Sequence, residues 1–464
     1  MSLSESPEQL FQLTLREVRQ ALDAGTNPGG GGIVFAGVST DTRTLRPGDL
    51  FVALVGSRSD GHQHIAAALR AGARGLVVSQ PVVASLDTPV LRVPDTEVAY
   101  GLLARFRRDR FDLPVVGVTG SVGKTTVKEM LSAALSPLGP VLKTEASQNN
   151  ETGVPKTLLQ LTPEHQAAVV EMGMRGAGQI AYLCGVARPT VGVTTTIADN
   201  HLELLGSRDA IADAKGELLE ALPAPALAVL NADDSYLPRL RARTAARVVT
   251  YGMEVSDAAD HFFPADLART DGGWRFELRG VPVLVPSLSR HDVGNALAAL
   301  AVADALGVPL ADAARALTHY TAPPMRMQVV QTPGGATVLN DAYNAAPASV
   351  ASALETLLAF PGGRKIAFLG DMRELGARAE DAHRELGAVI ASGGGLDALY
   401  TVGGLAALIP GATQRFADSE EAARFAREAL APRPGDVVLV KGSRAVAMEK
   451  IAAALAEPTP EAGP

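Results

Sequence analysis

The chain has 464 residues, of which 47% are hydrophobic and 20% are charged, and its formal net charge at pH 7 is −8. This composition indicates a globular protein, and the length predicts about three domains of the usual size. The acidic balance provides no broad basic surface, so nucleic acid is not expected as a partner.

The N-terminal segment, the apolar runs and the cysteine content bear on the compartment in which the protein is found. The N-terminal segment MSLSESPEQLFQLTLREV lacks a basic start followed by an apolar stretch, and the chain has no run of eighteen apolar residues. We therefore expect a cytoplasmic protein that is neither secreted nor inserted in a membrane. The single cysteine, Cys184, allows no internal disulfide and fits a reducing compartment. Because no histidine or aspartate neighbours it in sequence, we expect a small buried apolar residue rather than a nucleophile.

Apolar β-branched runs alternate along the chain with Ala- and Leu-rich helical stretches, which predicts an α/β fold built from βαβ units on parallel sheets. Proline-containing segments at 111–114 and 321–324 suggest two boundaries. We therefore expect a smaller α/β domain over 1–112, a central parallel-sheet domain over 113–322, and a last domain over 323–464. The expected buried strands include Gly75–Ser79, Val115–Thr119, Ala167–Glu171, Val191–Thr196, Ala226–Leu230, Ala336–Leu339, Lys365–Leu369 and Val437–Val440.

A glycine-rich turn follows the second of these strands, in VVGVTGSVGKTTVKEM from Val115 to Met130. The strict phosphate-loop pattern has a glycine where Val118 stands, so the match is partial. A strand, this turn and a predicted helix over 125–135 would direct backbone N–H groups at an anion, with Lys124 reaching the terminal phosphates and a threonine hydroxyl binding Mg²⁺. The alternative is an ordinary turn with a surface lysine. The expected phosphate-binding residues are Gly120, Ser121, Val122, Gly123, Lys124, Thr125 and Thr126.

Polar residues follow other predicted elements of the central domain, where ligands gather in α/β sheets. Asn149, Asn150, Glu151 and Thr152 precede a helix start and would favour a substrate carboxylate or phosphate, although simple capping is a competing explanation. Glu171 closes the strand AAVVE, and its carboxylate would suit Mg²⁺ unless it caps the helix that follows.

Two further residues of this domain are ambiguous from their surroundings alone. His201 follows VGVTTTIADN and would be either a metal ligand or a polar loop residue. Lys215 lies in DAIADAKGELLEAL, a predicted helix on which a lysine is ordinarily a solvated side chain.

The ordered blocks of this sequence resemble the Mur ligase family, which comprises ATP-dependent amide-bond-forming enzymes of peptidoglycan precursor synthesis. The shortened GxxGKTT loop is the usual form in that family. The blocks are VSTDTRTLRPGDLFVAL, GVTGSVGKTTVKEM, NNETGVPKTLL, EMGMRGAGQIAYL, NHLELLG, AKGELL, NADD, SRHDVGNALAAL, NDAYNAAPASV, LGDMRELG and KGSRAVAMEKI.

The resemblance implies three α/β domains, of which the first holds a uridine nucleotide, the second holds ATP, and the third is Rossmann-like and closes over the second. Ser39, Asp41 and Arg43 would contact the UDP moiety. The residues themselves offer a charge-assisted donor fork for a diphosphate, although a solvated turn is the alternative.

The resemblance also implies the ATP and Mg²⁺ sites. Lys124 and Thr125 would bind phosphates and Mg²⁺, and Glu171 and His201 would be metal ligands. Lys215 matches the carbamylated lysine of the family. Reaction of its amine with CO₂ would convert a repelling ammonium into an anionic oxygen donor that suits a hard cation.

The remaining implied contacts come from the end of the central domain and from the last domain. Asn295 would reach adenine, Arg326 the terminal phosphate and Asp341 the ribose. Tyr343 and Asn344, from the same NDAYNAAP block, are also expected to bind the nucleotide. This block has Ala346 where the family usually has asparagine. The expected catalytic residues are Lys124, His201, Lys215 and Arg326. The last domain also offers Asp371, Glu374, Lys441 and Ser443 as site residues, although loop carboxylates and basic residues near strand ends are often surface groups.

Within the family, the last domain carries LGDMRELG at 369–376, whereas the ligase that adds a diamino acid usually carries DNPR there. The resemblance therefore implies addition of D-alanyl-D-alanine to UDP-N-acetylmuramoyl-tripeptide through an acyl phosphate, giving UDP-N-acetylmuramoyl-pentapeptide, ADP and phosphate. The expected cofactors are ATP and Mg²⁺, and a monomer is expected. The alternatives are another amino-acid ligase of the family, a P-loop ATPase without amide-forming activity, and a catalytically silent binding protein.

Overall fold

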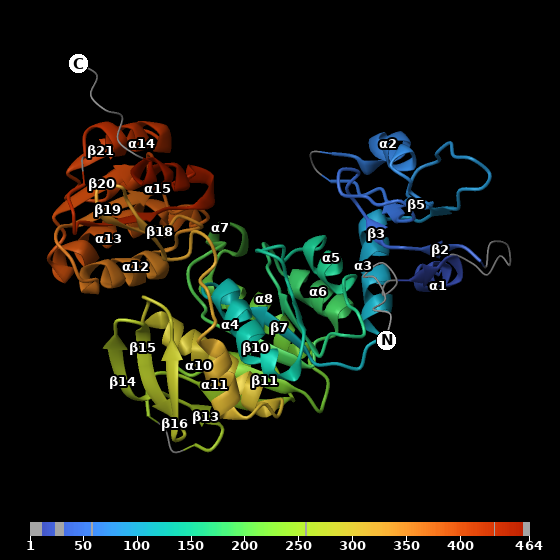
Figure 1. Cartoon of the computed structure of the whole chain (residues 1–464), viewed down its shortest axis with the longest axis horizontal. Coiled ribbons are helices and arrows are strands. Elements are labelled where there is room, and N and C mark those ends of the chain that lie inside the picture. Colours follow the sequence, from blue (N-terminus) through green and yellow to red (C-terminus); the bar gives the residue numbers. More distant parts are fainter. Residues whose placement is uncertain (1–11, 24–31, 57–58, 256–257, 431, 458–464) are drawn as a thin grey trace, which may run out of the picture.

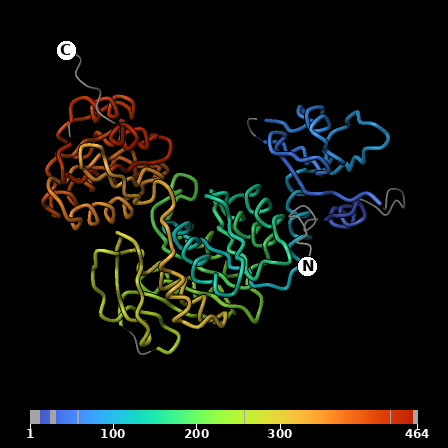
Figure 2. Tube along the Cα trace, in the orientation of Figure 1, coloured from blue at the N-terminus to red at the C-terminus, as the bar shows by residue number. Residues whose placement is uncertain are grey.

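The structure is a computed structural model, which describes residues 12–23, 32–56, 59–255, 258–430 and 432–457. Within these ranges, three sheets made mainly of parallel strands follow one another along the chain, accompanied by two smaller antiparallel sheets (Figure 1). The Cα trace shows the N-terminal and C-terminal regions at opposite ends of the molecule, with the central region between them (Figure 2).

The N-terminal region contains a short antiparallel pair and a four-stranded parallel sheet. Its first helix begins at a capping box, in which Thr14 and Glu17 bond each other's backbone amides. The elements are β1 (Leu13–Thr14), α1 (Leu15–Ala21), β2 (Val34–Phe35), β3 (Val38–Ser39), β4 (Leu50–Val52), α2 (Ile65–Arg70), β5 (Gly75–Val78) and β6 (Val90–Arg92).

Helix α3 (Thr96–Arg108) connects this region to the central one. Asp95 caps its first turn by accepting from the amides of Glu97 and Val98. At its last turn, two buried arginines donate to carbonyl oxygens of the central region: Arg107 to Leu161 and Arg108 to Ala187. The helix therefore packs on the central region beside α5 (Gly153–Leu158) and α6 (Gln179–Ala187).

The central region is built on a seven-stranded sheet in the order β13-β12-β11-β10-β7-β9-β8, and all of its strands are parallel. Alternate residues of these apolar strands enter two different hydrophobic clusters, one shared with α3, α5, α6 and α8 and the other with α4, α10 and α11. The strands are β7 (Val115–Thr119), β8 (Val141–Lys143), β9 (Ala167–Glu171), β10 (Val191–Thr194), β11 (Leu227–Asn231), β12 (Arg247–Tyr251) and β13 (His261–Phe262). The helices are α4 (Lys124–Ala134), α5 (Gly153–Leu158), α6 (Gln179–Ala187), α7 (Leu202–Leu205), α8 (Arg208–Glu220), α9 (Leu237–Arg241), α10 (His291–Ala305) and α11 (Leu310–Leu317).

The strand order of this sheet reverses at β7, because the chain continues to β8 and β9 on one side and to β10 on the other. Ligands of open α/β sheets bind beyond the carboxyl ends of the strands at such a point. The glycine-rich turn after β7 occupies that position.

An antiparallel three-stranded sheet, which the sequence patterns above did not predict, follows β13. Its strands are β14 (Ala265–Thr270), β15 (Gly273–Leu278) and β16 (Val281–Val285). One face of the sheet is buried through Phe276, Leu278, Val283 and Val285, which join the cluster of α4, α10 and α11.

The C-terminal region is a six-stranded sheet in the order β17-β18-β22-β19-β20-β21, parallel except for β17. Residues of this sheet enter two hydrophobic clusters. Helices α12 and α13 contribute to one cluster, and α14 and α15 contribute to the second. The elements are β17 (Gln328–Gln331), β18 (Thr337–Asp341), α12 (Pro347–Ala359), β19 (Lys365–Gly370), α13 (Ala379–Gly393), β20 (Ala398–Val402), β21 (Gln414–Phe416), α14 (Ser419–Glu428), β22 (Val437–Lys441) and α15 (Glu449–Ala456).

The predicted α/β class is confirmed, and each buried strand expected above is present, with ends that differ by at most two residues. Across the described ranges, no helix combines the length and the hydrophobicity that a bilayer span requires.

Candidate active site

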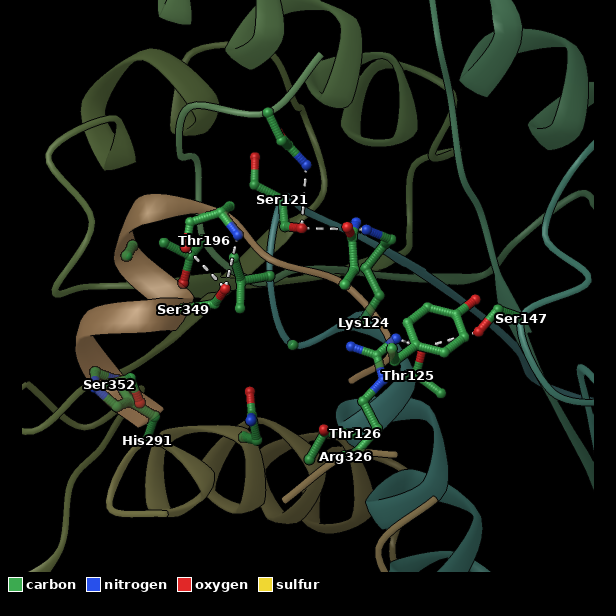
Figure 3. Close-up of a pocket in the computed structure, with 18 of the residues that line it drawn as sticks. Ser121, Lys124, Thr125, Thr126, Ser147, Thr196, His291, Arg326, Ser349 and Ser352 are labelled. Carbon is green, nitrogen blue, oxygen red and sulfur yellow. Dashed lines mark hydrogen bonds between the residues drawn. The ribbon is translucent and has the colours of Figure 1, made fainter. Parts of the chain in front are cut away.

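A cleft of about 1230 Å³ lies at the carboxyl ends of the central strands and is lined from both the central and the C-terminal regions. Figure 3 shows part of it, with Lys124, Thr125 and Arg326 directed at the same space. Six of the seven predicted loop residues, all but Gly120, line it.

Two glycines give the loop after β7 its shape. Gly120 and Gly123 have φ angles of +146° and +90°. A Cβ at Gly120 would lie 1.8 Å from the Thr195 Oγ1 atom, and one at Gly123 would lie 2.8 Å from the Asn295 Oδ1 atom. Gly123 is also the N-cap of α4 and brings no side chain to that helix end. The first-turn amides of α4 are thereby available to an anion, which is the geometry that a phosphate group requires.

Two lysines converge on the same loop carbonyl. Lys124 Nζ donates to Gly120 O at 2.7 Å, and Lys215 Nζ donates to that oxygen at 3.0 Å. Lys215 is only 1% exposed, so the alternative of a solvated helix lysine is wrong. Burial, together with the nearby Lys124 charge, holds the pKa of Lys215 well below its ordinary value. Burial also lowers the pKa of Lys124, against the attraction of Glu171.

Thr125 lies where the two regions meet. Its hydroxyl is 3.4 Å from the Ser147 hydroxyl and accepts a hydrogen bond of 3.2 Å from Arg326 Nη2. The Arg326 guanidinium lies 4.0 Å above the Tyr343 ring centroid, which fixes its orientation. A cationic donor from the segment before β17 therefore reaches the phosphate loop.

Glu171 is the last residue of β9, and one oxygen of its buried carboxylate has no hydrogen-bond partner. Its side chain is 1% exposed, Oε1 accepts from Asn149 Nδ2 at 2.7 Å, and Oε2 is buried without a hydrogen-bond partner. A buried carboxylate oxygen in this state is costly unless a cation or donor binds it. Together with the Thr125 hydroxyl, it fits a hard cation such as Mg²⁺. The capping alternative for Glu171 is wrong, because Gly178 is the N-cap of α6.

His201 begins α7 with a φ of +56°. Its Nδ1 lies 3.0 Å from Oε2 of Glu374, a C-terminal residue with a φ of +68°. The hydrogen bond from His201 holds the pKa of Glu374 below its usual value, although burial opposes it. In the described part of the chain, no group of three or more His, Cys, Asp or Glu side chains is arranged to hold a metal. The role of His201 as a metal ligand stays a prediction.

Some residues of the segment before α5 line the cleft, and others cap the start of the helix. Asn149, Asn150 and Glu151 line the cleft, whereas Thr152 does not. Asn150 Oδ1 accepts from the Gly153 amide at 3.0 Å and from the Thr152 hydroxyl at 3.1 Å, which is a capping arrangement.

The remaining implied nucleotide residues share the cleft with the phosphate loop. Asn295 Nδ2 donates to Asp292 Oδ1 at 2.8 Å. Asp341 Oδ2 accepts from Lys441 Nζ at 2.6 Å, and the same ammonium donates to Asn344 O at 2.9 Å. Ionic pairing of Asp341 leaves its carboxylate fixed at the edge of the cleft.

The predicted UDP-binding residues do not line this cleft. Ser39 Oγ donates to Asp41 O at 3.1 Å, and the exposed Arg43 pairs with Asp41 at 2.6 Å. Hydrogen bonds from Arg43 lower the pKa of Asp41 to about 2. The structure thus brings together the residues predicted in the central and C-terminal regions and keeps this N-terminal turn apart.

Sequence reasoning missed Lys128, which is fully buried beside the site. The available signal was its spacing, because Lys128 follows Lys124 by one helical turn in KTTVKEM.

Three family models match the chain in order. The model described as "Mur ligase family, catalytic domain" matches residues 34–108, "Mur ligase middle domain" matches residues 118–303, and "Mur ligase, glutamate ligase domain" matches residues 325–444.

Individual proteins resemble the chain over nearly its whole length. The UDP-N-acetylmuramoyl-tripeptide–D-alanyl-D-alanine ligase of Synechocystis sp. is 40% identical over 91% of this chain and 92% of its own. The crystal structure of MurF from Acinetobacter baumannii is 32% identical, with a TM-score of 0.88 over 97% of this chain and 100% of the other. The MurF ligase of Thermotoga maritima in complex with ADP is 31% identical, with a TM-score of 0.79 over 90% and 96%. At this identity and coverage, the chain belongs to the Mur ligase family.

Proposed function

We propose that this chain uses ATP to join D-alanyl-D-alanine to UDP-N-acetylmuramoyl-tripeptide, giving UDP-N-acetylmuramoyl-pentapeptide, ADP and phosphate. The main supporting observation is the contact of Arg326 with Thr125, which adds a second cation to a phosphate loop that already holds Lys124. The named ligase relative and the ADP complex of the Thermotoga maritima enzyme support the same reaction and the same nucleotide.

The chemistry divides into two steps. An oxygen of the tripeptide carboxylate attacks the γ-phosphorus of ATP, the bond to the ADP oxygen breaks, and an acyl phosphate forms. The dipeptide amine then attacks the acyl carbon, and phosphate leaves with the bonding electrons as the amine loses a proton. Lys124, the first-turn amides of α4 and Arg326 would bind and neutralise the transferred phosphoryl group.

The Mg²⁺ ion, when bound, would neutralise phosphate charge and orient the γ-phosphate. Thr125 and the unpartnered Oε2 of Glu171 would hold it, with His201 and Lys215 as the further proposed ligands. Asn295 and Asp341 would orient the adenosine. Ser39, Asp41 and Arg43 would bind the UDP group in the N-terminal region, which α3 connects to the central region.

We also propose domain boundaries near residues 112 and 322, which fall in the intervals between the matched family models. We also propose that the chain acts as a monomer in the cytoplasm, a compartment that fits the nucleotide substrates and the single reduced thiol.

The test of the reaction is substrate-dependent product formation. We expect ADP, phosphate and the pentapeptide product to appear only when the nucleotide-linked tripeptide and D-alanyl-D-alanine are both present, as measured by mass spectrometry and phosphate release.

The same assay tests the phosphate loop. Lys124→Ala should lower kcat by about 10²–10³-fold, because it removes a positioned cation from the transferred phosphate. ADP formation that needs no dipeptide would instead identify an ATPase, and full turnover by the variant would refute the role of Lys124.

Lys215 provides a second test. Its lowered pKa favours the neutral amine, which is the form that attacks CO₂ to give a carbamate with loss of a proton. We expect Lys215→Ala to be inactive and to recover partly in the presence of acetate, because a small carboxylate replaces the missing oxygen donor. Lys124→Ala is the matched control, since an anion cannot replace a cation. Equal acetate responses of the two variants, or full activity of Lys215→Ala, would contradict carbamylation.

A further inference from the structure

Lys128 is a buried cation that the mechanism above does not use. It lies on α4, is 0% exposed and does not line the cleft. Its ammonium donates to Thr144 O at 2.8 Å and to Ala146 O at 2.6 Å, and it lies 2.9 Å from Glu129 Oε1. An ammonium group has three N–H donors, so these contacts use all of them.

The two carbonyls belong to a segment between β8 and α5, here called the clamp loop and defined as residues 144–149. Ala146 in this loop has a φ of +49°, a left-handed conformation that residues with a Cβ adopt only at some energetic cost. The Lys128 ammonium binds the carbonyl of that same residue. The ammonium therefore stabilises the loop at its residue with a left-handed backbone.

Three polar groups of the clamp loop lie against Glu171 and Thr125, the two residues that would hold the cation. The Thr144 hydroxyl accepts from the Glu171 amide at 3.0 Å. Asn149 Nδ2 donates to Glu171 Oε1 at 2.7 Å, and the Ser147 hydroxyl is 3.4 Å from that of Thr125. Since Oε1 is occupied, the unpartnered Oε2 is the Glu171 oxygen left for a ligand. The loop thus fixes which atoms of Glu171 and Thr125 face the site.

We propose that Lys128 is a positioning residue for the divalent cation: its ammonium holds the clamp loop in the conformation that aligns Thr125 and Glu171. This inference rests on the proposed binding of a magnesium nucleotide. It adds a role for a residue that touches neither the cation nor the nucleotide.

The chemistry of the buried environment distinguishes this role from simple packing. An isolated buried ammonium is costly, and an unbranched apolar side chain would fill the same space without that cost. Burial would raise the pKa of Glu129, but hydrogen bonds from Lys143 and Lys128 outweigh it and hold that pKa below its ordinary value. The charge of Lys128 is therefore balanced by a carboxylate while its other two donors bind the loop.

The test measures ADP affinity by isothermal titration calorimetry, once with Mg²⁺ and once with EDTA. We expect Lys128→Met to raise the Kd in Mg²⁺ by about tenfold or more and to leave the Kd in EDTA within about twofold of wild type, as for residues that orient metal ligands. Lys143→Met is the matched control, because it removes the other, half-exposed ammonium on Glu129 without touching the loop carbonyls. It should behave as wild type in both conditions.

If Lys128→Met does not fold, Lys128→Gln replaces it, because the amide is uncharged and too short to reach both carbonyls. That variant should raise the Kd in Mg²⁺ by about threefold or more, again without an effect in EDTA. Equal losses in the two conditions, or no loss, would overturn the role of Lys128. A wild-type chain whose ADP affinity ignores Mg²⁺ would instead refute the metal site of the proposed function.

Discussion

The Cys184 thiol shows how burial sets the chemistry of a single residue. Its side chain is 3% exposed, and Sγ lies 3.7 Å from the sulfur of Met172. Burial, with a smaller effect from the charge of Glu217, raises the pKa of this thiol to about 12. The sequence-based expectation of a small buried apolar residue is confirmed by this environment.

A labelling experiment follows from that pKa. At pH 8, the native thiol should react with 5,5′-dithiobis(2-nitrobenzoic acid) orders of magnitude more slowly than the same chain in guanidinium chloride, since the nucleophile is the thiolate. Between pH 9 and 12 the unfolded chain releases this proton while the folded chain keeps it, so this thiol lowers the free energy of unfolding as the pH rises through that window. Rapid labelling of the native protein at pH 8 would contradict the burial.

Lys215 could have been predicted to be buried, because helical spacing places it with apolar residues. Ile211 and Ala212 precede it by four and three residues, and Leu218 and Leu219 follow by three and four, and all four are buried. What the spacing could not predict is its partner. The Gly120 carbonyl is 95 residues away in sequence, and only the packing of α8 against the loop after β7 brings the two together.

At the scale of elements, the local patterns were sufficient to predict β7, β9, β10 and β11, four of the inner strands of the seven-stranded sheet. Strands β7 and β9 have the predicted bounds, because continuous apolar β-branched runs are what a parallel sheet buried on both faces requires. The antiparallel sheet of β14, β15 and β16 was missed, although its signal was present. Buried and exposed residues alternate at Phe276, Glu277 and Leu278, and Gly280 with a φ of +80° forms the next turn.

The last turn of α3 contains two arginines whose burial and partners such local patterns cannot predict. Arg107 and Arg108 are consecutive charged residues that would ordinarily be assigned to solvent. Both are instead buried and donate to carbonyls of Leu161 and Ala187, which follow α5 and end α6 respectively. Cations suit the carbonyl-rich ends of helices, but the choice of helix depends on how the N-terminal and central regions dock.

At the scale of the whole molecule, the candidate site is assembled from regions that are distant in sequence. Arg326 meets Thr125 across 201 residues, and Glu374 of the C-terminal region meets His201. The phosphate-loop pattern predicted Thr125 and the family resemblance predicted Arg326, but no local pattern indicated that either pair of residues lies close together. Under the proposed function, the phosphate loop of the central region would bind the diphosphate of the nucleotide, whereas Arg326 from the segment before β17 would contact the transferred phosphoryl group.

We therefore expect Arg326→Ala to lower kcat strongly while leaving the affinity for ADP almost unchanged. Because ADP lacks the γ-phosphate that Arg326 would contact, its Kd should stay within about threefold of wild type, while kcat falls by about 10²–10³-fold. Tyr343→Phe is the control, since it keeps the aromatic face on which the guanidinium lies 4.0 Å from the ring centroid, and it should retain near-wild-type kcat. Steady-state kinetics and ADP titration measure the two quantities. If ADP affinity fell as far as kcat, Arg326 would be binding the diphosphate of the nucleotide rather than the transferred phosphoryl group.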